Sequence, residues 1–250
     1  MKLALLSDIH ANLQAFDACV EHAQAWGAQR FALLGDFVGY GADPVAVLRR
    51  VREFADAGAL VVKGNHDAMA VTPPREVQTV GDSTAAWTHA QLGADDLSFL
   101  DGLPLTLREG PVFLVHASAD QPQAWHYVYG HLAAERSLDA VAGIGDVRYV
   151  LGGHVHQQAL YYRGAGPGLM AFTPVPGVAL PVPRHRHWLA TVGSVGQPRD
   201  GDTRAMYAML DVDSAQLTFH RVAYDHLAAA AAIRHAGLPE FFAQRLEAGR

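Results

Sequence analysis

The chain has 250 residues, half of them hydrophobic, and a formal net charge of −6 at neutral pH. This composition supports a large core, and no apolar stretch is long enough to span a bilayer or to form the hydrophobic region of a signal peptide, so we expect no membrane partner. The acidic balance disfavours a nucleic-acid backbone as partner, while the single cysteine, Cys19, excludes an internal disulfide and predicts a cytoplasmic location.

Residues 1–62 alternate short apolar runs with helical periodicity. The predicted elements are a strand at 3–6, a helix at 11–26, a strand at 31–34, a helix at 44–57 and a strand at 60–62. Strands that alternate with covering helices are typical of a parallel sheet. No charge run, repeat or low-complexity linker divides the chain, so residues 1–250 are predicted to form a single domain.

Beyond residue 80 the pattern changes from alternating units to antiparallel strands. The predicted elements are a helix at 81–100, a hairpin of strands 103–107 and 111–115 around Glu109 and Gly110, a helix at 132–141, strands at 147–151, 158–163, 188–192, 205–210 and 216–223, and a helical tail from 226 that breaks near Gly237 and resumes after Pro239. The expected fold class is α/β, as a four-layer α/β/β/α sandwich with two mixed sheets packed face to face and helices outside.

Residues 164–183 are the least regular part of the chain, because Gly and Pro are frequent there. Such a composition favours a surface loop. The alternative interpretation is that this segment folds over the functional rim of the molecule.

The apolar runs share one feature, because each is followed at once by side chains with oxygen or nitrogen donors. In open α/β sheets, ligands bind just beyond the carboxyl ends of the strands, where these side chains are expected to converge. The blocks are Asp8-x-His10, Gly35-Asp36, Gly64-Asn65-His66-Asp67, His116 and Gly153-His154-Val155-His156. An unpaired ionisable group after a buried run is costly unless something binds it, so the sequence predicts a metal centre.

In this order, the blocks resemble the signature of the calcineurin-like metallophosphoesterase superfamily, and residues 193–202 are similar to a later block of its compact bacterial phosphodiesterase-type members. The resemblance implies two divalent metal ions. One ion is implied at Asp8, His10, Asp36 and His156, and the other at Asp36, Asn65, His116 and His154. Asp36 would therefore bridge the two ions.

Two divalent ions roughly 3.5–4 Å apart can hold both the attacking and the leaving oxygen of an in-line displacement at phosphorus. The many histidines favour transition metals over magnesium, with manganese expected first and iron, nickel, zinc or cobalt as alternatives. A water between the ions would lose a proton near neutral pH and act as nucleophile. His66 is then the candidate general acid for the leaving oxygen.

The substrate class is predicted from a departure within the superfamily. Ser/Thr protein phosphatases carry an Asp and an Arg shortly after the bridging Asp, whereas residues 37–41 contain neither and residue 68 is Ala. A phosphomonoester dianion gains more from such a clamp than a diester does. We therefore expect a small phosphodiester or a nucleotide phosphoanhydride, such as a cyclic nucleotide or a dinucleoside polyphosphate. Arg199 is the candidate replacement for substrate binding, and its alternative is a salt bridge to Asp200 or Asp202.

Three further features each have two interpretations. Asn12 either contacts substrate or caps the helix that follows it. The aromatic residues within 125–129 either stack a nucleobase or pack into the core. Asp67 is expected to cap a helix or to support the ligands rather than to bind metal.

Two other functions remain as alternatives to a phosphodiesterase-type enzyme. A broad phosphomonoesterase or Ser/Thr protein phosphatase would require another residue to bind the dianion. A non-catalytic scaffold should have gaps among the ligands or at the candidate acid, and the sequence has none. No feature of the sequence indicates a particular oligomeric state.

Overall fold

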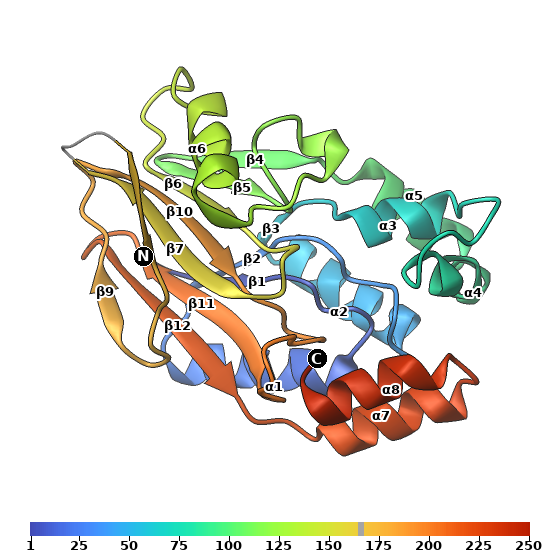
Figure 1. The fold of residues 1–250 in the computed structure, drawn as a ribbon. Helices are drawn as coiled ribbons and strands as arrows, with labels where there is room; N and C mark the ends of the chain where they lie inside the picture. Colours follow the sequence, from blue (N-terminus) through green and yellow to red (C-terminus); the bar gives the residue numbers. More distant parts are fainter. Residues whose placement is uncertain (165–167) are drawn as a thin grey trace.

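The computed structural model describes residues 1–164 and 168–250. Its apolar runs form two six-stranded mixed sheets (Figure 1). The first sheet contains the earliest strands of the chain and also its last two strands. Across this sheet the strands are β3 (Leu60–Val61), β2 (Arg30–Leu33), β1 (Lys2–Leu6), β11 (Ala205–Asp211), β12 (Gln216–Val222) and β9 (Ala179–Pro181). Strand β1 pairs parallel with β2 and antiparallel with β11, so it lies at the junction of the parallel and antiparallel halves.

The second sheet is built from the middle of the chain. Its strands are, in order, β4 (Thr106–Glu109), β5 (Val112–Val115), β6 (Tyr149–Gly152), β10 (His187–Val192), β7 (Gln158–Arg163) and β8 (Leu169–Phe172). Strands β5, β6 and β10 run parallel, and the outer pairs are antiparallel. The carboxyl ends of β5 and β6 therefore lie at one end of this sheet, as those of β1 and β2 do in the first.

The two sheets pack face to face through one apolar cluster. Leu3 and Leu5 of β1 lie in this cluster with Leu114 of β5, Trp188 of β10 and Phe219 of β12, and all are buried. Burying one side chain of this size contributes roughly 1.5–3 kcal/mol, so this layer is a major source of stability. Successive side chains of a strand point to opposite faces of the sheet, so Ala4 and Leu6 of β1 lie on the outer face, against helices.

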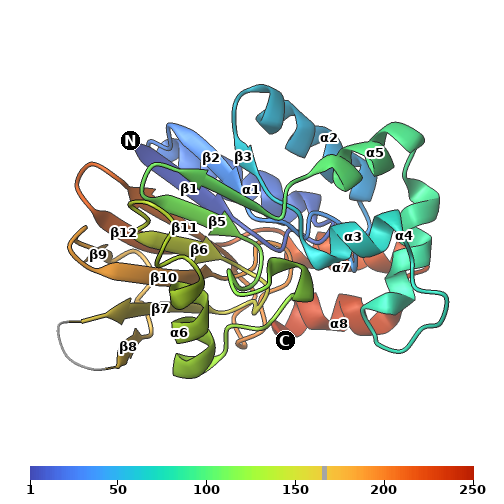
Figure 2. The same cartoon turned by 90° about the horizontal axis from the view of Figure 1, so that it is seen from above.

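The helices either cover the outer faces of the sheets or gather beyond one end of the strands, as the view from above shows (Figure 2). They are α1 (Leu13–Ala25), α2 (Pro44–Asp56), α3 (Asn65–Val71), α4 (Ala85–Gln91), α5 (Ala94–Gly102), α6 (Gly130–Ala140), α7 (His226–His235) and α8 (Glu240–Ala248), with 3₁₀ turns at Asp82–Thr84 and Pro122–Ala124. Helices α1 and α2 pack on the first sheet and α6 on the second. The predicted arrangement of two mixed sheets between helices is confirmed.

Several predicted element boundaries were wrong for local reasons. The single helix expected at 81–100 is divided, because Gly93 is extended and the side chain of Asp96 caps the start of α5 through Gly93 N. The strand expected at 103–107 begins later, since β4 pairs Thr106 with Val115 and Glu109 with Val112. Helix α3 was not predicted, because its seven residues begin inside the Asn65 block.

The segment 164–183 is more regular than its composition indicates. It contributes the edge strands β8 and β9, while residues 165–167 lie outside the described part of the chain. Strand β9 pairs with residues 216–218, which in turn align with the beginning of β1, the end opposite to Asp8. Strand β9 therefore lies away from the carboxyl ends of the strands, and the alternative that part of the segment covers the rim stays a prediction. Within residues 1–164 and 168–250, no helix has the length and apolarity needed to cross a membrane.

Candidate metal centre

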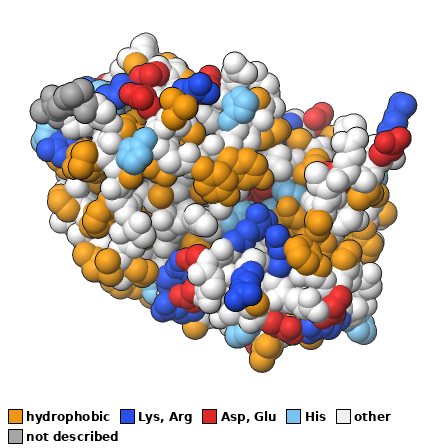
Figure 3. Space-filling model, in the orientation of Figure 1, with side chains coloured by type: hydrophobic (Ala, Val, Ile, Leu, Met, Phe, Trp, Pro, Cys, Tyr) orange, Lys and Arg blue, Asp and Glu red, His pale blue; other side chains and the backbone are white. Residues whose placement is uncertain are grey.

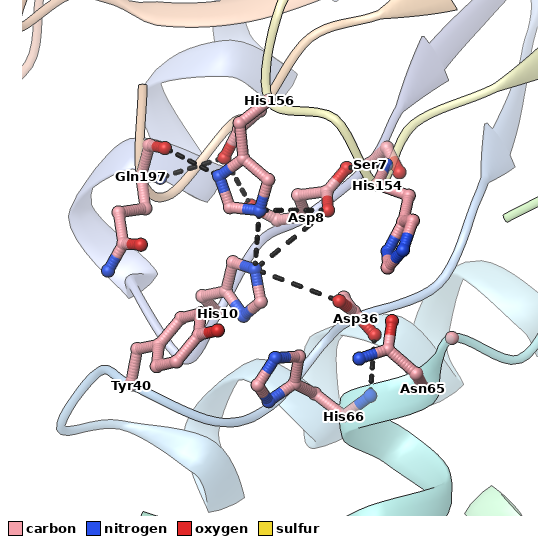
Figure 4. A network of polar contacts seen from close by, with 12 residues as sticks. Ser7, Asp8, His10, Asp36, Tyr40, Asn65, His66, His154, His156 and Gln197 are labelled. Carbon is pink, nitrogen blue, oxygen red and sulfur yellow. Dashed lines mark hydrogen bonds and ion pairs between the residues drawn. The ribbon is translucent and has the colours of Figure 1, made fainter. Parts of the chain in front are cut away.

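The candidate ligands follow the strands β1, β2, β3, β5 and β6. The loop after β1 is fixed from two sides, because Asp8 N donates to Gly35 O at 3.0 Å and Val195 N donates to Ser7 O at 2.9 Å. The sequence blocks, which are far apart along the chain, therefore meet at one rim (Figure 4). This rim joins the two sheets, since β1 and β2 belong to one and β5 and β6 to the other.

The backbone at the candidate ligands is unusual. Residues other than glycine rarely adopt positive φ, and such strained positions concentrate at functional sites. The candidate ligands with positive φ are Asp8 (54°), His10 (50°), Asp36 (55°), His154 (67°) and His156 (55°). The surrounding loops hold each of these residues in a conformation that costs about 1–3 kcal/mol. No local sequence pattern indicates this backbone conformation directly.

Asp36 lies at the middle of the cluster. Its Oδ2 atom is 3.3 Å from His116 Nε2 and 3.8 Å from His10 Nε2, while its Oδ1 accepts a hydrogen bond from His66 N at 2.8 Å. Asp36 belongs to one group of potential metal ligands with His116 and His154 and to another with His10 and His66. One carboxylate thus faces two separate sets of nitrogen donors.

The orientation of the His10 and His156 rings shows whether a cation fits between them. The Nδ1 atom of His10 lies 3.2 Å from Val38 O, and that of His156 lies 2.6 Å from Gln197 O. A carbonyl oxygen only accepts hydrogen bonds, so both Nδ1 atoms carry a proton, and the Nε2 atom of each ring is left to face the other. These two Nε2 atoms are 3.1 Å apart (Figure 4). Two lone pairs at this distance repel each other unless a proton or a metal ion lies between them.

The second set of donors has the same character. His116 Nδ1 lies 2.7 Å from Leu34 O, so its Nε2 faces the cluster, where Asn65 Oδ1 is 3.1 Å away. His154 Nε2 and Asp8 Oδ1 are buried and have no hydrogen-bond partner among the described residues. Buried polar atoms without partners are rare in native proteins, and here they converge on one space. Imidazole nitrogens and carboxylate oxygens together fit divalent transition metals.

The electrostatics keep the two carboxylates ionised. Burial alone would raise the pKa of Asp36, but the neighbouring imidazoles of His116 and His66 hold it well below its usual range. Burial is likewise outweighed at Asp8, where His156 lowers the pKa. Conversely, burial opposes the charged form of His116, yet the Asp36 carboxylate raises its pKa to about 9. The cluster therefore has negative charge that attracts protons, or metal ions in their place.

At His154 and His10 the Asp36 carboxylate also raises the pKa, but burial outweighs it. Burial, followed by the nearby His116, lowers the pKa of His154 to about 4, and burial lowers that of His10 well below its ordinary value. Both imidazoles are therefore neutral at physiological pH. A neutral imidazole is the form that binds metal.

His66 and Asp67 begin helix α3 and contribute in different ways. The Asp67 carboxylate accepts hydrogen bonds from Asp36 N and Phe37 N, each at 2.8 Å, and from Gly64 N at 2.9 Å. It thus caps α3 and fixes the Asp36 loop. The ring of His66 packs at 4.3 Å from that of Tyr40 and at 5.0 Å from that of His10. Burial lowers the pKa of His66, and the carboxylate of Asp36 opposes this shift.

The two residues predicted to bind substrate differ in their surroundings. Asn12 Oδ1 accepts from Ala15 N at 3.1 Å, and its Nδ2 donates to Gly196 O at 2.9 Å and to Tyr224 Oη at 3.2 Å. Asn12 is therefore the N-cap of α1, which supports the capping interpretation, and its contact with substrate stays a prediction.

Arg199 does not form the salt bridge considered as its alternative. Asp200 pairs with Arg221 and Asp202 with Arg204, whereas Arg199 donates through Nη2 to Gln197 Oε1 at 2.8 Å. Its guanidinium lies 5.8 Å from the centre of the Tyr40 ring.

Aromatic side chains form the walls of the site. Tyr127 stacks on His154 with ring centroids 4.0 Å apart, and Tyr129 stacks on Tyr127 at 5.4 Å. Both tyrosines are about half exposed, so of the residues 125–129 only Val128 is in the core. Tyr40, 4.4 Å from the ring of His10, was not predicted to lie at the site (Figure 4). Its position two residues beyond Val38, in the loop after Asp36, was the only available signal.

A family model and a relative both match nearly all or most of the chain. Residues 1–215 match the family model described as the calcineurin-like phosphoesterase superfamily domain. An uncharacterized protein of Methanocaldococcus jannaschii is 31% identical over 254 residues, which cover 99% of this chain and 98% of that protein.

Solved structures give the same result. The crystal structure of a metallophosphoesterase from Sphaerobacter thermophilus superposes with a TM-score of 0.86 at 34% identity, covering 100% of this chain and 99% of the other. A hypothetical protein from Pyrococcus horikoshii superposes with a TM-score of 0.78 at 18% identity, covering 100% and 98%. At that identity the second likeness concerns the fold alone.

Proposed function

This chain belongs to the calcineurin-like phosphoesterase superfamily, and on that premise we propose that it hydrolyses small phosphodiesters or nucleotide phosphoanhydrides with the help of two divalent transition-metal ions. The observation that carries the proposal is the pair of Nε2 atoms of His10 and His156 facing each other at 3.1 Å beside Asp36. A single domain in a cytoplasmic setting fits this assignment.

The proposed ligands fall into two sets that share Asp36. One set is Asp8, His10, Asp36 and His156, and the other is Asp36, Asn65, His116 and His154. When bound, the ions would act as Lewis acids on a phosphoryl oxygen and lower the pKa of water at the site. Manganese is the first candidate, with iron, nickel, zinc and cobalt as alternatives.

His66 is proposed as the general acid that gives a proton to the leaving oxygen. Its side chain is buried within the candidate ligand cluster, where its ring packs against that of Tyr40. Burial disfavours its protonated form. A phosphate anion beside the ring would favour that form, because an opposite charge within a few ångströms stabilises the imidazolium. His66 would thus take up its proton as substrate binds.

The diester or anhydride preference is supported by what surrounds Asp36. The Phe37–Gly41 loop has neither the Asp nor the Arg found in protein phosphatases of the superfamily, and Phe37 and Val38 are buried. The alternative, a broad phosphomonoesterase or protein phosphatase, is favoured by one observation. Arg199 has no carboxylate partner within 4.0 Å among the described residues and lies beside Tyr40, so it could bind a dianion.

The test is turnover of purified protein of known metal content on two chromogenic substrates, bis(p-nitrophenyl) phosphate and p-nitrophenyl phosphate, with manganese supplied. A higher kcat/KM for the diester supports the proposed substrate class. A higher kcat/KM for the monoester would favour the alternative. Absence of turnover on both esters and on ADP, with both ions bound, would favour a non-catalytic scaffold.

A further inference from the structure

Two arginines from distant parts of the chain meet beside the metal centre. Arg199 follows the Gly193–Gln197 loop, and Arg245 lies on α8 in the C-terminal helical pair. Arg199 Nη2 is 2.8 Å and Arg245 Nη1 is 3.1 Å from the same atom, Gln197 Oε1. One neutral amide oxygen is therefore the shared acceptor of two guanidinium groups.

The positive charge of this pair is not neutralised within the protein. Both arginines are partly buried, and neither has a carboxylate within 4.0 Å in the described part of the chain. Burial and then the charge of Arg199 lower the pKa of Arg245, which reflects the repulsion between the two groups. Holding two like charges together is unfavourable unless an anion binds between them. A guanidinium group can donate two parallel hydrogen bonds to the oxygens of one phosphate.

The pair adjoins the reacting centre without belonging to it. Gln197 joins the two, because its backbone oxygen accepts from His156 Nδ1 while its side chain faces the arginines. The ring of Tyr40 contacts His10 and also lies under Arg199, so the pair is one side chain further out than the ligands. Figure 3 shows Lys and Arg side chains gathered in the central hollow of this face, beside His side chains.

We propose that Arg199 and Arg245 form a second anion-binding site, which holds a phosphate group next to the one that reacts. The inference rests on the proposed function and narrows its substrate to phosphoanhydrides, such as nucleoside polyphosphates. In the reaction, a water oxygen forms a bond to the attacked phosphorus and the bond from that phosphorus to the bridging oxygen breaks. The bridging oxygen leaves with the second phosphate and receives a proton from His66, while the attacking water releases one, so the protons balance.

Binding can be tested apart from catalysis. We would titrate chelator-treated protein with inorganic pyrophosphate by calorimetry, for the wild type, Arg199→Gln, Arg245→Gln and the control Arg49→Gln. Arg49 is exposed on α2 and loses the same charge. Each change at the pair should weaken binding roughly 10- to 100-fold, the value of one hydrogen bond to a charged group, whereas the control should bind as the wild type does. Equal binding by all four proteins would overturn the proposal.

Turnover then tests the substrate class. In the metal-loaded protein, we expect the ratio of kcat/KM for ADP to that for bis(p-nitrophenyl) phosphate to fall roughly 10- to 100-fold in each arginine variant. Arg199→Lys, which keeps the charge, should restore part of the ratio. A general structural role would lower both kcat/KM values together and leave the ratio unchanged, which would contradict the proposal.

Two further outcomes separate this inference from the proposed function. If the wild type hydrolyses the diester but not ADP, the phosphoesterase function stands and the anhydride class is wrong. If p-nitrophenyl phosphate turnover falls as much as ADP turnover, the pair binds the reacting dianion instead. If the wild type hydrolyses none of these substrates while pyrophosphate binding still depends on both arginines, the proposed function fails and the anion site remains.

Discussion

At the scale of single residues, Asp36 is the side chain on which both donor sets depend. Its Oδ2 atom faces His116 on one side and His10 on the other. We expect Asp36→Asn to reduce the content of both metal ions together, because a neutral amide is a poor bridging ligand. Replacing a residue that merely orients a metal ligand weakens metal binding about 10- to 100-fold. Replacing Asp36 should weaken metal binding at least as much.

Metal content per chain after gel filtration, measured by plasma mass spectrometry, would check this prediction. Asp139→Asn, an exposed change on α6, is the matched control. Full occupancy of both sites in Asp36→Asn would show that Asp36 does not bridge the ions.

His66 provides a test of the proton donor. We expect His66→Ala to keep its metal ions and to lower kcat by about 10²- to 10⁴-fold, the usual contribution of a general acid. The metal content of this variant must be measured, because potential ligand atoms of His66, His10 and Asp36 lie within 4.8 Å of one another. If the ions are lost in His66→Ala, His66 is a ligand and another group must supply the proton.

Most residues of the candidate centre could be brought together from the sequence, because each candidate ligand follows an apolar run and both features are local. The contributors that sequence reasoning missed belong to no such block. Arg245 reaches the site only because α8 packs beside the loop that carries Gln197, a contact between residues 48 positions apart. Tyr40 likewise lies at the site because the ring of Phe242 supports it at 4.9 Å. Such contacts depend on tertiary packing, which no local pattern records.

At the scale of secondary-structure elements, the packing of α1 on β11 and β12 buries a titratable group. His220 of β12 is 3% exposed, and its ring stacks on Tyr207 of β11 and touches Trp26 at the end of α1. Burial, followed by the nearby His22, lowers the pKa of His220 to about 4 from its ordinary value of 6.5. The folded chain therefore resists a proton that the unfolded chain accepts.

This burial predicts a pH-dependent stability. Below pH 6.5 the unfolded state binds a proton that the folded state excludes until about pH 4, so the contribution is complete above 6.5 and is lost as the pH falls toward 4. The loss amounts to at most about 3 kcal/mol. We expect His220→Phe to reduce the fall in Tm between pH 7.5 and pH 5, compared with the wild type and with the exposed control His235→Phe. An unchanged pH profile would contradict the burial argument.

The predictability of the elements follows from their length and periodicity. The longer elements α1 and α2 were predicted to within a few residues, because an apolar face repeats over several turns. The strands β8 and β9 were missed, since they have four and three residues and lie in a segment rich in Pro and Gly. Pairing with β7 and β12 makes these residues strands, and pairing partners are not visible in local sequence.

At the scale of the whole molecule, the candidate metal centre lies where the two sheets meet. Asp8 and Asp36 come from loops of the first sheet, whereas His116 and His154 come from loops of the second. Without a cation, these two buried carboxylates of the first sheet are held ionised by their neighbours and repel each other, whereas ions bound between them and the histidines of the second sheet would link the two sheets. Metal ions should therefore stabilise the complete fold and not only the rim.

We expect a chelator to lower the Tm of the protein, and added manganese to raise it. Because the ions bind the folded state, free metal at 100 times its Kd should add about 2.7 kcal/mol to the free energy of unfolding. Differential scanning calorimetry over a range of manganese concentrations would measure the effect, with Asp36→Asn as the variant expected to respond least. A Tm that does not change with metal would mean that the ions do not couple to folding.

The left-handed backbone of the ligands limits how the site can change over generations. Asp8, Asp36 and His154 occupy a region of φ that costs most residues about 1–2 kcal/mol and that Asn, Asp and Gly enter more readily. A substitution that abolishes metal binding is therefore best tolerated when the new residue is Asn or Gly, because the loops then keep their shape. A descendant that had lost its chemistry along this path would retain the architecture of an active enzyme, and its rim would still be a preformed hollow open to a new ligand.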